Sequence, residues 1–169
     1  MKPLATGSLL ACAFALTACA SDPIVGTWRN SVDVLGSPVV ADFTFGADHT
    51  FTTATRFTYP ADAPSFAMCT QVTRTSGTNW SATSTTSGMT TTMTLTLTPS
   101  SMPNVTLERT GCHDAADNVP PTQQDPSAQG MTTESTYTYS IASDQLSLTS
   151  TGNGMMSTTV FMRVTGSMM

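Results

Sequence analysis

Side chains that could carry out acid–base or hydrolytic chemistry are few in this chain. Only two histidines are present, and each stands next to an aspartate, in Asp48-His49 and His113-Asp114. With one of the many serines, either pair could form a Ser-His-Asp set, but no G-x-S-x-G elbow or similar motif presents a serine for attack. We therefore interpret both pairs as turn residues, predict no catalytic residue, and expect that the protein is not an enzyme.

Oxygen ligands for a metal ion gather in one place. Asp114, Asp117 and Asn118 could coordinate calcium, but the run lacks the glycine and the terminal carboxylate of an EF-hand loop. We expect solvated loop residues here, and the sequence predicts no metal site and no cofactor.

The four cysteines fall into two groups. Cys12 and Cys19 lie in the N-terminal leader, whereas Cys69 and Cys112 lie in the region expected to fold. An isolated pair in an oxidising compartment favours a disulfide. A metal pair and a redox pair are the alternatives, and no C-x-x-C spacing supports either. A bridge closing about 43 residues would contribute about 4 kcal/mol in the chain-entropy model.

Residues 1–18 have the features of a secretory signal peptide. Lys2 supplies positive charge, and the run Leu9–Leu16 forms a short apolar core followed by small residues. This core is too short to span a bilayer, which takes about 20 apolar residues.

The end of this signal, Leu16-Thr17-Ala18-Cys19, resembles the lipobox of bacterial lipoproteins. The resemblance implies cleavage before Cys19 and attachment of acyl chains such as palmitate, with residues 19–23 as a lipidated tether. Several chains make a stable anchor where a single chain does not. Ala20 and Ser21 resemble the pattern of lipoproteins sorted to the outer membrane. Secretion or a periplasmic location is the alternative, because Ala18-Cys19-Ala20 also fits an A-x-A cleavage site.

The composition of the remaining chain limits its partners. Residues 19–169 are enough for one domain, and they carry five arginines, eleven carboxylates and no lysine. A net charge of −6 argues against nucleic acid and against electrostatic binding to anionic lipid. Membrane attachment is therefore expected through the acyl chains alone, and the identity of any protein partner is left open.

Residues 24–169 read as short strands separated by turn signals. Threonine is abundant and favours extended backbone, and the clearest alternation places Met93, Leu95 and Leu97 on one face. Ser76-Gly77 is expected to be a turn, and Pro99 and Pro103 to bracket a connection. Residues 110–130 are expected to be a long loop, functional or disordered. The expected strands are Ile24–Asn30, Val39–Phe45, His49–Tyr59, Phe66–Thr75, Thr78–Thr85, Met89–Thr98, Val105–Arg109, Thr132–Ile141, a short run through Leu146 and Leu148, and Met155–Val164.

This pattern predicts an all-β fold, an antiparallel up-and-down barrel of eight to ten strands. A barrel leaves no open edge if its first and last strands pair. We expect Gly26-Thr27-Trp28 in the first strand to meet Phe161-Met162-Arg163-Val164 in the last, with the Arg163 guanidinium over the Trp28 ring.

Gly26, Trp28 and Arg163 resemble the G-x-W motif and the late basic residue of the calycin superfamily, and within it the lipocalin-like barrels of bacterial lipoproteins. The runs Gly77–Ser81, Tyr139–Ile141 and Asp144–Leu148 are similar to strands of such domains. The resemblance implies a lipocalin-like barrel over residues 24–169, in which these three residues act in barrel closure.

The expected function is binding of a small hydrophobic or amphipathic molecule inside the barrel. A barrel filled by its own side chains, acting as a structural or protein-interaction module of the cell envelope, is the alternative. Arg56, Arg74 and Arg109 would matter only if one points inward, because a buried cation needs a partner such as a carboxylate ligand. The side chains that could line a cavity are Phe43, Phe45, Phe51, Phe57, Trp80, Tyr137 and Tyr139.

Overall fold

A computed structural model describes residues 22–34, 36–127, 132–152 and 155–165. The expected signal peptide, the lipid-anchor residue Cys19 and part of the expected 110–130 loop lie outside the described residues. The elements are β1 (Gly26–Val34), β2 (Ser37–Phe45), β3 (Thr50–Thr58), β4 (Thr70–Ser87), β5 (Thr90–Thr110), the 3₁₀ turn η1 (Ala115–Asp117), β6 (Val119–Gln124), β7 (Ser135–Ala142), β8 (Gln145–Gly152) and β9 (Met155–Arg163).

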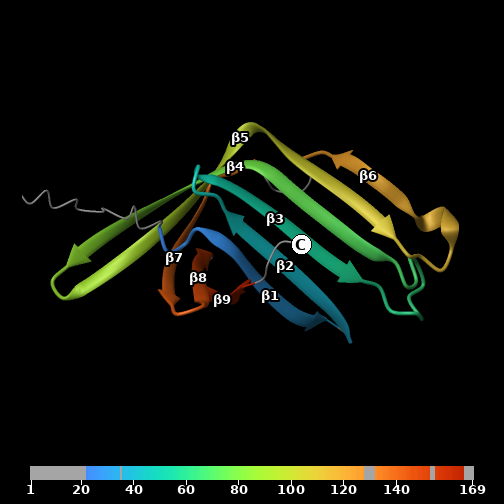
Figure 1. Ribbon diagram of the computed structural model, residues 1–169, viewed down its shortest axis with the longest axis horizontal. Helices are drawn as coiled ribbons and strands as arrows, with labels where there is room; N and C mark the ends of the chain where they lie inside the picture. Colours follow the sequence, from blue (N-terminus) through green and yellow to red (C-terminus); the bar gives the residue numbers. More distant parts are fainter. Residues whose placement is uncertain (1–21, 35, 128–131, 153–154, 166–169) are drawn as a thin grey trace, which may run out of the picture.

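Eight of these strands close into an antiparallel barrel, which confirms the predicted fold class (Figure 1). Neighbouring strands follow the order β1, β2, β3, β4, β5, β7, β8 and β9, and β9 returns to β1. The ninth strand, β6, lies outside this ring and pairs with β5. Among the described residues, no helix has the length and apolar character needed to cross a membrane.

The two longest strands, β4 and β5, correct the sequence-based boundaries. Four expected strands are joined into two, because Ser76-Gly77 forms a bulge within β4 rather than a turn. Gly77 has φ +79°, a conformation that suits glycine. Pro99 and Pro103 lie within β5 rather than in a connection. They are tolerated because β7 pairs with residues 93–97 and β6 with residues 105–109, which leaves one side of β5 unpaired between them.

The expected loop at 110–130 is also corrected. It contains η1 and the strand β6, which pairs antiparallel with β5, Leu107 opposite Thr122 and Arg109 opposite Val119. Pro120 and Pro121 misled the sequence interpretation. They fit here because both lie on an edge strand at the register shift between the Leu107–Thr122 and Arg109–Val119 pairs, where the ladder is interrupted. The strand covers an edge of β5 that would otherwise be open.

Because β5 changes neighbours along its length, the molecule has two parts. In the closed end, residues 93–97 of β5 pair with β7, and the ring continues through β8 and β9 to residues 28–29 of β1. In the open extension, β1 to β6 form a curved sheet without β7, β8 or β9; it comprises residues 30–34, 37–41, 55–58, 70–76, 104–110 and β6. The tip of the β4–β5 hairpin projects from the other side of the closed end (Figure 1).

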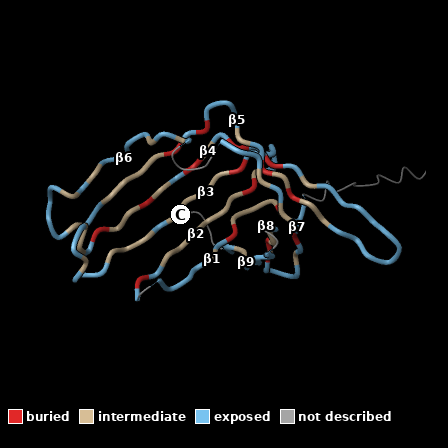
Figure 2. The backbone as a smooth tube through the Cα atoms, turned by 180° about the vertical axis from the view of Figure 1, so that it is seen from behind, coloured by how far each residue is buried: buried red, intermediate tan, exposed pale blue. Residues whose placement is uncertain are grey.

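The hydrophobic core fills the closed end. Most buried residues lie on the side of the molecule that contains β7 and β8 (Figure 2). Leu95 is fully buried and Leu97 nearly so, which confirms the alternation expected for this run. We call the face of the sheet that carries these residues the inward face. The core cluster is Ile24, Trp28, Phe45, Phe51, Trp80, Leu95, Leu97, Tyr139, Leu146, Leu148 and Phe161.

Candidate functional site

The two ends of the barrel meet at Trp28 and Arg163. These residues are register partners in the β1–β9 pairing, and the guanidinium carbon of Arg163 lies 4.0 Å from the centroid of the Trp28 ring. Arg163 Nη1 donates to the carbonyl of Val25 at 3.0 Å, and Nη2 donates to the carbonyl of Pro23 at 2.6 Å. One side chain thus ties the last strand to the segment that leads into the first.

Gly26 makes this arrangement sterically possible. Its φ is +131°, and a Cβ atom at this position would lie 2.8 Å from Nη1 of Arg163. Trp28 is fully buried, and its indole Nε1 donates to the carbonyl of Ile24 at 2.7 Å. Both the ring and its polar atom are therefore engaged in closing the barrel.

The aromatic residues expected to line a cavity are divided by the structure into three groups. Phe45, Trp80 and Tyr139 are buried in the core of the closed end. Phe43, Phe51 and Tyr137 line an open cavity. Phe57 lies farther out, in the extension, with its ring edge-on to Tyr59.

This cavity lies on the inward face where the closed end passes into the extension. Its volume is about 260 Å³, slightly below the usual range for sites of drug-sized molecules. Apolar walls come from Phe43, Phe51, Leu97, Pro99 and Tyr137, and hydroxyl groups come from Thr53, Thr55, Thr75, Thr78, Thr133 and Ser135. Such a lining accepts a small apolar group, or one end of a longer molecule.

The two histidines are placed in separate connections. His49 lies in the β2–β3 turn with φ +64°, and its ring packs 4.9 Å from that of Trp80, centroid to centroid. His113 follows β5, and its backbone N–H donates to the carbonyl of Ala67. Across the described ranges, no group of three or more His, Cys, Asp or Glu residues is placed to hold a metal ion.

Cys69 and Cys112 form a disulfide, as predicted. Cys69 is fully buried just before β4, and Cys112 follows β5. The bridge therefore joins the segment between β3 and β4 to the segment that leads into β6, at the far end of the extension. Phe66, expected in a strand, lies instead in the first of these segments with φ +58°.

Of the three arginines singled out in the sequence, one lies on the inward face. Arg56 and Arg74 belong to the opposite face of the extension, and Arg74 pairs with Glu108 at 3.1 Å. Arg109 shares its face with Val105 and Leu107, and its guanidinium carbon lies 3.8 Å from the centroid of Phe66. This contact was not predictable from the sequence, because the strand phase beyond the bulge was unknown.

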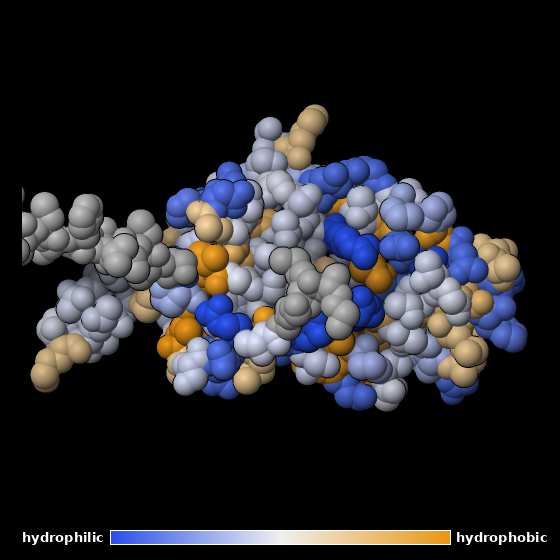
Figure 3. Space-filling view, in the orientation of Figure 1, coloured by the Kyte–Doolittle hydropathy of each residue, from blue (hydrophilic) through white to orange (hydrophobic). Residues whose placement is uncertain are grey.

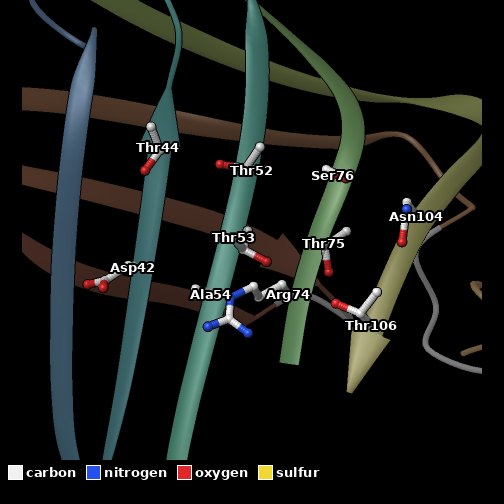
Figure 4. A pocket seen from close by; sticks show the side chains of 10 residues that line it. All are labelled: Asp42, Thr44, Thr52, Thr53, Ala54, Arg74, Thr75, Ser76, Asn104 and Thr106. Atoms are coloured by element: carbon white, nitrogen blue, oxygen red, sulfur yellow. The ribbon is translucent and has the colours of Figure 1, made fainter. Parts of the chain in front are cut away.

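A second hollow lies on the outer face of β2 to β5 (Figure 4). Its charged side chains already have partners, since Asp42 pairs with Arg29 at 2.6 Å and Arg74 with Glu108. The remaining lining is mostly threonine and serine. The face shown in Figure 3 is likewise polar for the most part, with small separate apolar areas. Among its lining residues, the hollow therefore offers no unpaired charge around which a ligand would be organised.

Comparisons with protein-family models, with curated proteins and with solved structures gave no match. The proposed function therefore rests on the barrel and its cavity.

Proposed function

We propose that this protein is a lipocalin-like lipoprotein of the cell envelope whose barrel binds a small hydrophobic or amphipathic molecule. The observation that carries the proposal is the cavity of about 260 Å³ at the mouth of the closed end, with aromatic and aliphatic walls and a ring of hydroxyl groups. Concave, mostly apolar sites with a few polar groups are where proteins bind small molecules. The calycin resemblance of Gly26, Trp28 and Arg163 supports the same class of function.

The proposed location follows from the leader. Acylation of Cys19 would attach the barrel to the membrane, in the outer membrane if the residues after the cysteine direct it there. The disulfide supports an oxidising compartment such as the bacterial periplasm. A secreted or periplasmic soluble form is the alternative, and both place the binding cavity outside the cytoplasm.

A filled barrel with a structural or protein-interaction role is the second candidate. The observation in its favour is the closed end, where Phe43 packs 4.6 Å from Phe161 and Phe45 lies 5.8 Å from Trp80, centroid to centroid. These contacts fill this part of the closed end with the protein's own side chains. The two candidate functions therefore differ in whether a ligand occupies the cavity where the closed end passes into the extension.

Native mass spectrometry of the secreted chain with Cys19→Ser tests the proposal. The expected result is a stoichiometric extra mass that leaves on denaturation. Thr55→Phe, which fills the cavity from β3, should abolish the extra mass, whereas Thr52→Phe, on the outer face of the same strand, should retain it. A bare mass for the parent chain, unchanged after incubation with alkyl alcohols and acids, would favour the filled barrel.

A further inference from the structure

Arg109 differs from the other arginines in its surroundings. Arg29, Arg74 and Arg163 form ion pairs with Asp42, Glu108 and Asp144, respectively, and Arg56 is exposed to solvent. Arg109 is partly buried, and no ion pair or hydrogen bond of its side chain is found among the described residues. Its face is stacked on Phe66 instead.

Two guanidinium atoms of Arg109 are left without an acceptor. Nε and Nη1 are both buried, and neither makes a hydrogen bond. A buried donor without a partner costs about 1–3 kcal/mol, and more when the group is charged. Stacking on Phe66 satisfies the face of the cation but not its N–H edge. The N–H edge of the Arg109 guanidinium therefore lacks a negatively charged hydrogen-bond acceptor.

The position of Arg109 connects it with the cavity. Thr75 lines the cavity and is the register partner of Val105, and Arg109 lies four residues farther along the same face of β5. At the rise of an antiparallel strand, this separation is about 14 Å. Phe57 and Leu107, both half-buried on the inward face, lie between the cavity and Arg109. An alkyl chain lying along this face would contact Phe57 and Leu107, with the polar residues Thr73 and Gln71 beside them.

We propose that Arg109 binds the carboxylate of an amphipathic ligand whose alkyl chain runs along the inward face into the cavity. This inference rests on the proposed function and adds the chemistry of the ligand's head group. A carboxylate matches the planar N–H fork of arginine with two parallel hydrogen bonds. Because the protein is acidic overall, long-range attraction does not favour an anion, and this local cation must supply the recognition.

The segment that covers Arg109 explains how a carboxylate reaches it. Residues 60–68 carry Phe66 over the guanidinium, and both Phe66 and Met68 have positive φ values, 58° and 62°. Non-glycine residues in this region are strained and concentrate at sites that change conformation. The Cys69–Cys112 bridge and the hydrogen bond from His113 N–H to the Ala67 carbonyl hold the base of the segment. A carboxylate that displaces the edge of this cover can pair with Nη2 and one of the two buried donors, because the N–H groups of Nε and Nη1 point to different sides of the guanidinium.

Matched ligands that differ only in the head group test the assignment. Dodecanoic acid and dodecan-1-ol are titrated into the secreted Cys19→Ser chain at pH 7 by calorimetry. The acid should bind at least about tenfold more tightly, because charge-assisted hydrogen bonds are worth about 1.5–3 kcal/mol. Arg109→Met should reduce the affinity for the acid to that for the alcohol and leave the alcohol unchanged. Arg56→Met, on the opposite face, should retain the preference.

A measurement without substitution keeps the inference testable if Arg109→Met does not fold. In the 15N-arginine-labelled chain, one Nε resonance should shift on addition of the acid and not of the alcohol. Equal affinities for acid and alcohol in the parent chain would overturn the Arg109 site while leaving the cavity intact. Binding of neither compound would overturn the proposed function as well.

Discussion

At the scale of single residues, the closure of the barrel depends on the absence of a side chain at Gly26, beside the Arg163 guanidinium. Gly26→Ala adds a Cβ atom 2.8 Å from Nη1 of Arg163 and forces an alanine to adopt φ +131°. We expect it to lower the free energy of unfolding by about 2–3 kcal/mol, part from backbone strain and part from the clash. Denaturant unfolding of Gly26→Ala, Arg163→Ala and the double variant separates the two parts.

In the double variant, the cost of the alanine at position 26 should fall to the backbone part alone, since Arg163 no longer occupies the space. If the two single effects simply add, the guanidinium does not limit residue 26, and this account of the G-x-W glycine is wrong.

We expect Tyr139 to make the free energy of unfolding depend on pH in the alkaline range. Burial raises the pKa of its phenol, with a smaller contribution from the charge of Asp22. Below the ordinary pKa of about 10, the folded and unfolded chains hold the same proton, so this residue adds no slope. Above it, the unfolded chain loses its proton first, and the free energy of unfolding falls until the folded pKa is passed.

Tyr139→Phe should therefore flatten the decline in stability above about pH 10. Urea midpoints measured across this range for the parent and the variant check the prediction. An unchanged slope in Tyr139→Phe would assign the alkaline loss of stability to other groups.

At the scale of elements, the bulge in β4 joins the closed end to the extension. Gly77→Ala introduces a Cβ atom 3.2 Å from the Cα of Pro103, in addition to the strain of φ +79°. Gly88, at the hairpin tip, has φ +61° and open space around it. We expect Gly88→Ala to cost about 1 kcal/mol and Gly77→Ala at least about 1 kcal/mol more. Chemical unfolding of both variants measures the difference, and equal costs would contradict close packing at the bulge.

The strands of the closed end were predictable, whereas those of the extension were predictable only in part. The alternation of apolar and polar residues through Leu95 and Leu97 was sufficient to predict a strand, because one face of that strand is buried. Ser76-Gly77 and the prolines of β5 and β6 were misread, since the same residues mark turns in most chains and bulges or edges in others. Which of these applies depends on neighbouring strands that the local sequence does not specify.

The candidate site divides in the same way. Gly26, Trp28 and Arg163 carried enough pattern to be paired from the sequence. Cys69 and Cys112 are the only two cysteines in the region expected to fold, so each had one possible partner there. The contact between Arg109 and Phe66 arises from a strand phase set by the bulge and from the conformation of the loop next to the Cys69–Cys112 disulfide. Neither is encoded in a short motif.

At the scale of the whole molecule, the barrel is unevenly closed. The β1–β9 pairing is confined to Trp28 with Arg163 and Arg29 with Met162, and beyond it β1 continues into the extension without β9. Where β1 and β9 separate, a side-chain hydrogen bond still joins them: Nδ2 of Asn30 donates to the carbonyl of Val160 at 2.7 Å. The other neighbouring strands pair over longer runs. We therefore expect the ring to open first at the β1–β9 pairing.

Hydrogen exchange followed by mass spectrometry tests this order of opening. Peptides from β9 should exchange faster than peptides from residues 70–80 of β4, which pair on both sides. Asn30→Ala removes the bond to Val160 and should accelerate exchange in β9 while leaving β4 unchanged, with a loss of about 1 kcal/mol in global stability. Ser31→Ala, the neighbouring exposed position, is the matched control and should alter neither strand. If β9 is as protected from exchange as β4 in the parent chain, the short β1–β9 pairing is not the place where the barrel opens first. Entry of the proposed ligand would then proceed through the opening between the closed end and the extension, without opening of the ring.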